Sequence, residues 1–213
     1  MASDKRLNDL LKWSIQNQET PDGAAAPASE RTPLDPKLLE ALFGGPSEPE
    51  LMKAAMEVIT SSDPEVTLES KLTAFDNFEQ LIENLDNANN LANLELWTPL
   101  LGCLEHNESE MRKMAAWCVG TAVQNNIKSQ EKLLAMGGIP KLIDAVLSDE
   151  EDKTVRRKAI YALSSACRNY QPAMDVCTTE LDKRGHSHGT IDSLDMDAVD
   201  VVMNALKSIA GTQ

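Results

Sequence analysis

The sequence lacks long apolar runs and paired cysteines. Nowhere do about 18 consecutive apolar residues occur, the length that a membrane-spanning helix requires. The first residues, MASDKRLNDLLKWSIQN, also lack the apolar core of a secretory signal. Cysteines 103, 118, 167 and 177 show no C-x-x-C spacing, and two of them fall within helical patterns, where a thiol behaves as a small hydrophobic side chain. We therefore expect a protein of a reducing compartment, either cytoplasmic or both cytoplasmic and nuclear.

Positive charge is also scarce. The 213 residues hold 20 Lys and Arg against 34 Asp and Glu, which gives a formal charge of −14, and only 4% of the residues are aromatic. Binding to phosphate backbones or anionic lipid depends on clustered Lys and Arg, so we expect neither nucleic acid nor a membrane as a partner. A hydrophobic fraction of 42% suffices for one sizeable core, or for one core with tails.

Motifs for catalysis or cofactor binding are absent as well. Neither Gly44-Gly45 nor Gly137-Gly138 is followed by the Lys-Ser/Thr or the spaced glycines of a phosphate-binding loop. His186 and His188 lie in a polar segment and could be argued as metal ligands, but no third ligand at helical spacing accompanies them. An exposed loop is the better interpretation. We expect no enzyme activity, no metal and no cofactor.

Composition divides the first 62 residues into three parts. Residues 1–17 form a short amphipathic arm, and residues 18–34, rich in Pro and Ala without any period, form a flexible linker. Residues 35–62 predict short helices. Asp35-Pro36 suits a helix start, Gly44-Gly45 suits its end, and the capping box Ser47-x-x-Glu50 opens a helix that runs through Ile59.

From residue 63 onward the sequence predicts long helices that repeat. Apolar residues spaced by three and four form one core-facing stripe: Leu68, Leu72, Phe75, Phe78, Ile82 and Leu85. Three segments match position by position, at spacings of 41 and then 44 residues. They are Lys71, Ala74, Phe78, Leu81 and Asn84; Arg112, Ala115, Val119, Ala122 and Asn125; and Arg156, Ala159, Leu163, Ala166 and Asn169. Such periods indicate armadillo or HEAT repeats.

The segment AMGGIPKLIDAV, residues 135–146, favours the armadillo repeat. Its glycines can end one helix with positive φ, and Pro140 can start the next. The segment WTPLLGCL, residues 97–104, is a shorter echo, and an Ala-rich helix, MAAWCVGTAVQNN, follows it. The predicted fold is all-α, an armadillo-type α-solenoid over residues 63–213. It has about three repeats plus capping helices, and the last helix, from Met196 to Ile209, caps the end.

Basic residues open the last helix of each repeat, where the helix dipole disfavours cations. They are Arg112, Lys113, Arg156, Arg157 and Lys158. Two explanations remain open. The residues can pair with the acidic loops before them, Glu108 and Glu110 or Asp149 to Asp152, which we favour, or they can contact carboxylates of a partner.

Asparagines are concentrated in FDNFEQLIENLDNANNL, residues 75–91. Asn77 and Asn84 lie about 20° apart on a helix of 100° per residue. Through the repeat they predict two rows on one face of the stack: Asn77, Cys118 and Ala162, and Asn84, Asn125 and Asn169. Amides offer donors and acceptors without charge, which suits a protein-binding groove. Capping of helix ends is the alternative, and it explains Asn87, Asn90 and Asn126 well but Asn77 and Asn84 less well.

Six segments carry a family resemblance: LLKWSI, DPKLLEALFGGP, AFDNFEQLIENLDNANNL, LWTPLL, GTAVQNN and YALSSACRNYQPAM. Together they span most of the chain, and they resemble the armadillo-type nucleotide exchange factors of the heat shock protein 70 chaperone, the Fes/HspBP group. The resemblance implies a monomeric co-chaperone that binds the chaperone's nucleotide-binding domain and promotes release of ADP and then of client. A general armadillo adaptor that binds an extended peptide is the alternative. Members are often longer, with a fourth repeat.

The resemblance also implies partner-binding residues. These are Asn77, Asn84, Asn87, Ala88, Asn89, Gln124, Asn125, Asn126, Arg168 and Asn169. We expect Asn84→Arg combined with Ala88→Arg to abolish nucleotide exchange while the helical fold stays intact.

The N-terminal arm generates a separate hypothesis. Its apolar residues, Leu7, Leu10, Leu11, Trp13 and Ile15, lie beside basic ones and resemble the client peptides that such chaperones bind. The flexible linker would hold the arm near the client site at high effective concentration. Packing of the arm on its own solenoid is the alternative.

Deletion of residues 1–33 is expected to slow client release and to leave ADP release unchanged, because only the arm would compete with clients. Fluorescence of a labelled client peptide and of a labelled nucleotide separates the two steps. Client release at the full-length rate would remove the hypothesis.

Overall fold

The structure of the chain is a computed structural model that describes residues 46–212. Within them one compact unit begins at Glu48. The predicted arm with Leu7, Leu10, Leu11, Trp13 and Ile15, the linker of residues 18–34 and the helix start at Asp35 lie outside the described residues. Across residues 46–212, no helix is both long and apolar enough to cross a membrane.

Every regular element of the described residues is a helix, which confirms the all-α prediction. The helices are α3 (Glu48–Thr60), α4 (Leu68–Ile82), α5 (Leu85–Asn90), α6 (Trp97–Gly102), η1 (Cys103–Glu105), α7 (Ser109–Val123), α8 (Ile127–Ala135), α9 (Gly138–Leu147), α10 (Lys153–Cys167), α11 (Gln171–Lys183) and α12 (Met196–Ala210). The predicted bounds of α3 and α12 are correct to within one residue.

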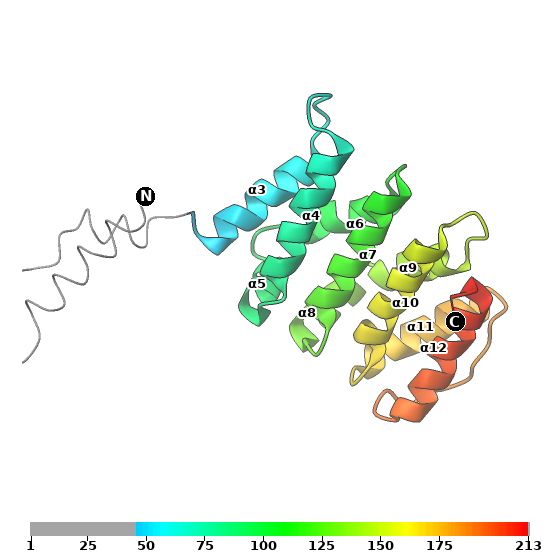
Figure 1. Cartoon of the computed structure of the whole chain (residues 1–213). Helices are drawn as coiled ribbons and strands as arrows, with labels where there is room; N and C mark the ends of the chain where they lie inside the picture. The colour runs from blue at the N-terminus through cyan, green and yellow to red at the C-terminus, as the bar shows by residue number, and fades with distance from the viewer. Residues whose placement is uncertain (1–45, 213) are drawn as a thin grey trace, which may run out of the picture. The chain divides into compact units, whose positions relative to one another are not determined.

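The helices pack in rows that repeat along the chain (Figure 1). The long helices α4, α7, α10 and α12 lie side by side, each in contact with the next. Helices α5, α8 and α11 form a second row, and α9 packs against α10, α11 and α12. Each unit thus consists of a short helix, a middle helix and a long helix, as α5, α6 and α7 and then α8, α9 and α10 show. This succession is the arrangement expected of an armadillo-type solenoid.

Local chemistry sets the helix boundaries. The Thr67 hydroxyl accepts a hydrogen bond from the Ser70 amide at 3.2 Å and caps α4. Gly137 adopts φ 68° between α8 and α9, a conformation that favours glycine. A Cβ atom on Gly138 would lie 2.1 Å from the Leu133 side chain, so the second glycine allows α8 and α9 to approach. The G-G-I-P segment therefore makes the turn that the sequence predicts.

The core lies between the rows. Phe75, Phe78 and Ile82 are fully buried, as the stripe on α4 predicts. Leu68 and Leu85 at its two ends are exposed, because Leu68 is the first residue of α4 and Leu85 already belongs to α5. The apolar stripe therefore faces the core only inside the helix.

Helices α7 and α10 approach each other through small side chains. Ala115, Cys118 and Ala122 on α7 are fully buried, as are Ala159 and Ala162 on α10. At the closest point, a Cβ atom on Gly120 would lie 2.4 Å from the Tyr161 ring and 3.2 Å from the Ala162 Cα atom. The two helices are thus in contact near their backbones, and no side chain larger than hydrogen fits at this position.

Polar bonds also join successive repeats. Gln130 on α8 is 2% exposed, and its amide nitrogen donates to the carbonyls of Ser165, Ala166 and Arg168 at 2.9, 3.2 and 3.0 Å. These carbonyls end α10 and have no partner within the helix. Gln130 therefore satisfies one repeat's helix end from the preceding repeat.

The C-terminal part differs from the prediction in one way. The sequence pattern after Met174 does not predict a helix, but α11 continues to Lys183, and its residues Cys177 and Leu181 are buried. Helix α12 packs against α9 and α10 as the fourth member of the row of long helices, at the end where the cap is expected. Only residues 184–195, which lack a helix, take the place of the middle helix in this last unit.

Substitution of Gly120 tests the close approach of α7 and α10. Gly120→Ala is expected to lower the free energy of unfolding by about 1 to 2 kcal/mol, because the methyl group must displace the Tyr161 ring and meets the α10 backbone. Urea denaturation measures this change. Gly102→Ala on α6 is the matched control. Nothing lies within 4 Å of the added methyl group, so helix propensity should leave stability unchanged or slightly higher. Equal stabilisation by both variants would contradict the packing.

Candidate protein-binding face

The exposed side of the row of α4, α7, α10 and α12 carries three hollows. We call this side the row face. The N-terminal groove lies between α3 and α4 and is lined by Leu51, Val58, Asn77 and Asn84 among others, with a volume of about 530 Å³. The aromatic slot lies between α4, α7 and α10 and has a volume of about 410 Å³. The C-terminal groove lies between α10 and α12 and has a volume of about 640 Å³. The rows of helices thus leave a series of recesses along one side.

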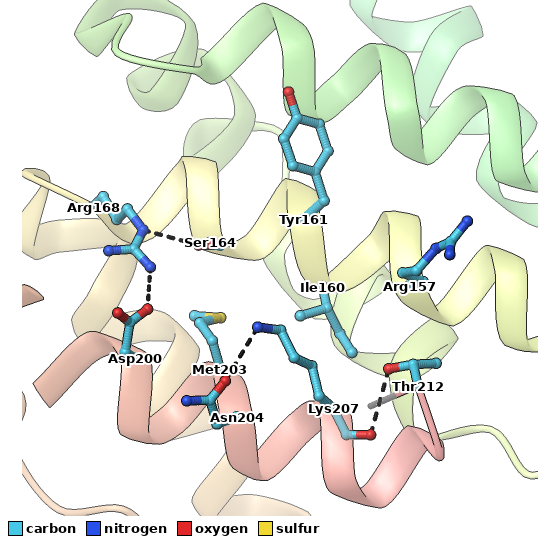
Figure 2. A pocket seen from close by; sticks show the side chains of 10 residues that line it. All are labelled: Arg157, Ile160, Tyr161, Ser164, Arg168, Asp200, Met203, Asn204, Lys207 and Thr212. Carbon is cyan, nitrogen blue, oxygen red and sulfur yellow. Dashed lines mark hydrogen bonds and ion pairs between the residues drawn. The ribbon is translucent and has the colours of Figure 1, made fainter. Parts of the chain in front are cut away.

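The C-terminal groove is apolar at its base and cationic at its rim (Figure 2). Ile160 and Met203 are buried and line it. Arg168 pairs with Asp200 and donates to the Ser164 hydroxyl at 3.0 Å.

Two further cations, Arg157 and Lys207, lie on the C-terminal groove's rim, and both side chains are exposed. Lys207 donates to the Asn204 amide oxygen at 3.1 Å, whereas the Arg157 guanidinium has no hydrogen-bond or ion-pair partner within the described part of the chain. Three cations against one carboxylate make this groove locally positive in a chain of charge −14.

The aromatic slot is built around Trp117 and Tyr161, which are both half-buried. The Lys158 ammonium lies 3.4 Å from the centroid of the Trp117 ring and 5.7 Å from that of Tyr161, a cation–π arrangement. Burial lowers the pKa of Lys158, an effect that the charge of Glu79 opposes. The Tyr161 hydroxyl lies 3.0 Å from the Gln124 side-chain oxygen, to which it donates. Side chains from α4, α7 and α10 therefore meet in this slot.

Asn77 and Asn84 are exposed and line the N-terminal groove, as a binding role requires. The prediction that Asn84 lies within a continuous helix is wrong, because α4 ends at Ile82. Asn84 instead caps α5, and its side-chain oxygen accepts from the Asp86 amide at 2.9 Å. Capping and exposure are combined at this residue.

The predicted amide rows are only partly on the surface. Asn125 and Asn169 are exposed and adopt φ 51° and 58°, the left-handed region that asparagine tolerates, directly after α7 and α10. The other row is wrong, because Cys118 and Ala162 are fully buried between the long helices. Asn77 is thus the exposed member of that row. Gln124 and Arg168, which end α7 and α10, lie beside Asn125 and Asn169 in the chain and line the aromatic slot and the C-terminal groove.

Two other predicted residues are buried and make hydrogen bonds within the chain. Asn87 is 5% exposed and donates to the Glu48 carboxylate and the Leu81 carbonyl, both at 2.9 Å. Asn126 is equally buried, caps α8 and donates to the Ser129 hydroxyl at 2.9 Å.

Ala88 is 3% exposed, so the expectation that Ala88→Arg leaves the fold intact is wrong. A guanidinium group at that position would have to enter the core. Asn89 is half-buried and lines a separate hollow beside α8, where its side-chain oxygen is buried without a hydrogen-bond partner.

Three of the five basic residues at the helix starts pair within the chain, and two of them, Lys113 and Arg156, pair with acidic residues that precede them in the chain, as favoured. Arg112 instead pairs with the loop before α10. Arg112 binds the Glu151 carboxylate with two hydrogen bonds of 2.6 and 2.7 Å, and these bonds raise its pKa. Lys113 pairs with Glu110. Arg156 donates to the Ser148 carbonyl and lies 3.8 Å from Asp149. The exceptions are Lys158, whose ammonium lies over the Trp117 ring, and Arg157, which lies on the C-terminal groove's rim.

Sequence reasoning missed the contact of Trp117, Lys158 and Tyr161. A signal was available, because Asp76, Trp117 and Tyr161 occupy one register at the spacings of 41 and 44 residues. Residues in one register lie beside each other once the repeats stack. In residues 46–212 no group of three or more His, Cys, Asp or Glu side chains could hold a metal, and His186 and His188 gain no third ligand.

A row of long helices that presents aromatic, amide and basic side chains in open recesses defines a helical-repeat protein that binds other proteins. Two family models match the chain: "Nucleotide exchange factor Fes1" over residues 7–91 and "SIL1/FES1/HPBP1 C-terminal domain" over residues 87–178. The chain belongs to the Fes1 family of nucleotide exchange factors.

Individual relatives agree with this family. The Hsp70 nucleotide exchange factor FES1 of Gibberella zeae is 61% identical, with 98% of this chain and 99% of the relative covered. The Neurospora crassa relative of the same description is 54% identical over 97% and 98%. The Eremothecium gossypii relative is 51% identical over 78% of this chain but only 57% of its own length. The chain thus resembles relatives of its own length throughout and a longer relative in part.

Neighbouring amides distinguish capping from surface positions. Asn126→Ala is expected to lower the free energy of unfolding by about 1 to 2 kcal/mol, because it removes the cap of α8 and a buried donor. Asn125→Gly should change stability by less than about 0.5 kcal/mol, because glycine adopts the same positive φ. Thermal unfolding followed by circular dichroism measures both. Equal losses of unfolding free energy in the two variants would contradict the buried capping role of Asn126 and the surface position of Asn125.

Proposed function

We propose that this chain binds the nucleotide-binding domain of an Hsp70 chaperone through the row face and promotes release of ADP, and thereby of client. The relatives that match nearly the full chain carry the description Hsp70 nucleotide exchange factor. The observation that carries the proposal is the row face itself, where aromatic, amide and basic side chains from four helices stand open beside one another.

Exchange by such a protein is a matter of linked binding. A factor that prefers the nucleotide-free chaperone over the ADP-bound form weakens ADP binding by the same ratio, and a hundredfold effect requires about 2.7 kcal/mol of differential contact. Contacts that both chaperone states offer equally contribute nothing to that difference. The protein must therefore hold its own shape while the chaperone changes.

The bonds between repeats supply this rigidity. Gln130 joins α8 to the end of α10, Arg112 joins α7 to the loop before α10, and the Thr121 hydroxyl donates to Glu79 at 2.7 Å across α7 and α4. Bending of the stack would break charged or buried hydrogen bonds, which is costly. The row face therefore keeps its shape when the partner binds.

The proposal assigns no chemical step to this chain, so it acts as a non-enzymatic, monomeric co-chaperone without a cofactor. Its location is the cytoplasm. Residues 1–17 remain proposed as a client-like arm, residues 18–34 as a linker, residues 35–62 as N-terminal helices and residues 63–213 as the solenoid. Of the predicted contacts, the exposed Asn77, Asn84, Asn125 and Asn169 are retained on the row face.

Rapid-mixing fluorescence of labelled ADP tests the proposal. The purified chain is expected to accelerate ADP release from the chaperone. Arg157→Glu should reduce this acceleration about tenfold, because it reverses a charge on the C-terminal groove's rim that no side chain of residues 46–212 pairs with.

Lys128→Glu is the matched control, because Lys128 is equally exposed but lies on α8, away from the row face. Both variants change the net charge by the same amount. A wild-type chain that leaves ADP release unchanged would refute the function, and equal effects of the two variants would refute the face. An adaptor that binds extended peptides would show the first of these results.

A further inference from the structure

The aromatic slot has features of a binding site for a cation. It is lined by two carboxylates, Glu79 and Glu83, by the aromatic rings of Trp117 and Tyr161 and by the side-chain amides of Gln124 and Asn125. No Lys or Arg lines it. The slot has a volume of about 410 Å³, which exceeds that of any single side chain, and it is open to solvent on the row face.

The two carboxylates differ in whether groups of this chain already neutralise their charge. Glu79 is 7% exposed, accepts a hydrogen bond from the Thr121 hydroxyl at 2.7 Å and interacts electrostatically with Lys158. Glu83, the residue directly after α4, is exposed, and its side-chain carboxylate has no hydrogen-bond or ion-pair partner among residues 46–212. The free negative charge of the slot is therefore that of Glu83.

The aromatic rings are held in place before any partner arrives. Lys158 lies over Trp117, and the Tyr161 hydroxyl is bonded to Gln124. Gly120 leaves room for the Tyr161 ring against α7, since a Cβ atom there would lie 2.4 Å from it. Ordered rings cost little further entropy on binding, which is typical of residues that dominate interface energies.

We propose that the aromatic slot receives a basic side chain, arginine or lysine, of the bound chaperone. The carboxylate of Glu83 pairs with the cation, and the rings of Trp117 and Tyr161 flank its planar or alkyl part. This inference rests on the proposed function. The slot lies next to the cationic C-terminal groove, with which it shares Tyr161. The two neighbouring hollows carry opposite charge, and this fixes the direction in which the partner lies along the row.

The test compares a carboxylate on α4, Asp76, with one directly after that helix, Glu83. Glu83→Gln is expected to weaken binding to the chaperone's nucleotide-binding domain about tenfold, because an almost isosteric amide removes the unpaired charge. Glu83→Lys should weaken it further. Asp76→Asn is the matched control, because Asp76 is also exposed on α4, two turns earlier, but does not line the slot. Its effect should stay below twofold. Isothermal titration calorimetry measures the three affinities, and urea denaturation checks that each variant is folded.

A double-mutant cycle then identifies the occupant. Each exposed Arg and Lys of the nucleotide-binding domain is replaced by Ala and titrated with the wild-type chain and with Glu83→Gln. One basic residue is expected to couple, so that its removal abolishes the tenfold effect of Glu83→Gln. Additivity at every basic residue, or equal losses for Glu83→Gln and Asp76→Asn, would overturn the inference.

The proposed function is judged separately by the wild-type chain. If the wild type accelerates ADP release but Glu83→Gln binds as tightly as the wild type, only the cation site fails. If the wild type neither binds the domain nor accelerates release, the proposed function fails before the variants are considered.

Discussion

The close approach of α7 to α10 governs the arrangement of this protein. Gly120, Ala159 and Ala162 let the two helices touch near their backbones, and this is the most extensive helix contact in residues 46–212. Because the interface is filled by small side chains, the large rings of Trp117 and Tyr161 lie at its outer edge. The same packing that closes the core thus presents aromatic groups on the row face.

Hydrogen bonds between repeats add direction to this packing. Dispersion between alanines would tolerate some sliding or rotation of one helix on another, whereas an amide directed at the carbonyls of a helix end would not. Gln130 makes such contacts with the C-terminal end of α10. Arg112 and Glu151, joined by two hydrogen bonds, hold the loop that leads into the N-terminal end of α10. Both ends of α10 are therefore fixed relative to the preceding repeat.

Much of the fold could be predicted because its signals are local. The capping box at Ser47, the glycines at 137 and 138 and the spacing of Phe75, Phe78 and Ile82 each specify a nearby backbone or burial state, and α3, α9 and α4 follow them. The extension of α11 to Lys183 was missed because its polar residues hide an apolar stripe of only Cys177 and Leu181. The helix is stabilised there by burial of its apolar side against α9, which helix propensity alone does not predict.

The site was harder to predict than the fold. The identity of an asparagine does not show whether it caps a helix, and Asn125 and Asn126 are adjacent yet lie on the surface and in the core. The contact of Lys158 with Trp117 joins residues of different repeats, so it exists only once α7 and α10 are stacked. Roles that depend on two chain segments meeting cannot be assigned from either segment alone.

The burial of all four cysteines has a chemical consequence. Thiols react with disulfides and alkylating reagents as thiolates, and burial raises the pKa of Cys103 to about 11, so that at neutral pH roughly one such thiol in ten thousand is ionised. Cys118, Cys167 and Cys177 are each 0% exposed. Oxidants and labelling reagents therefore meet these sulfur atoms only in molecules whose repeats have opened. The rate at which the thiols become modified therefore measures how often the solenoid unfolds transiently.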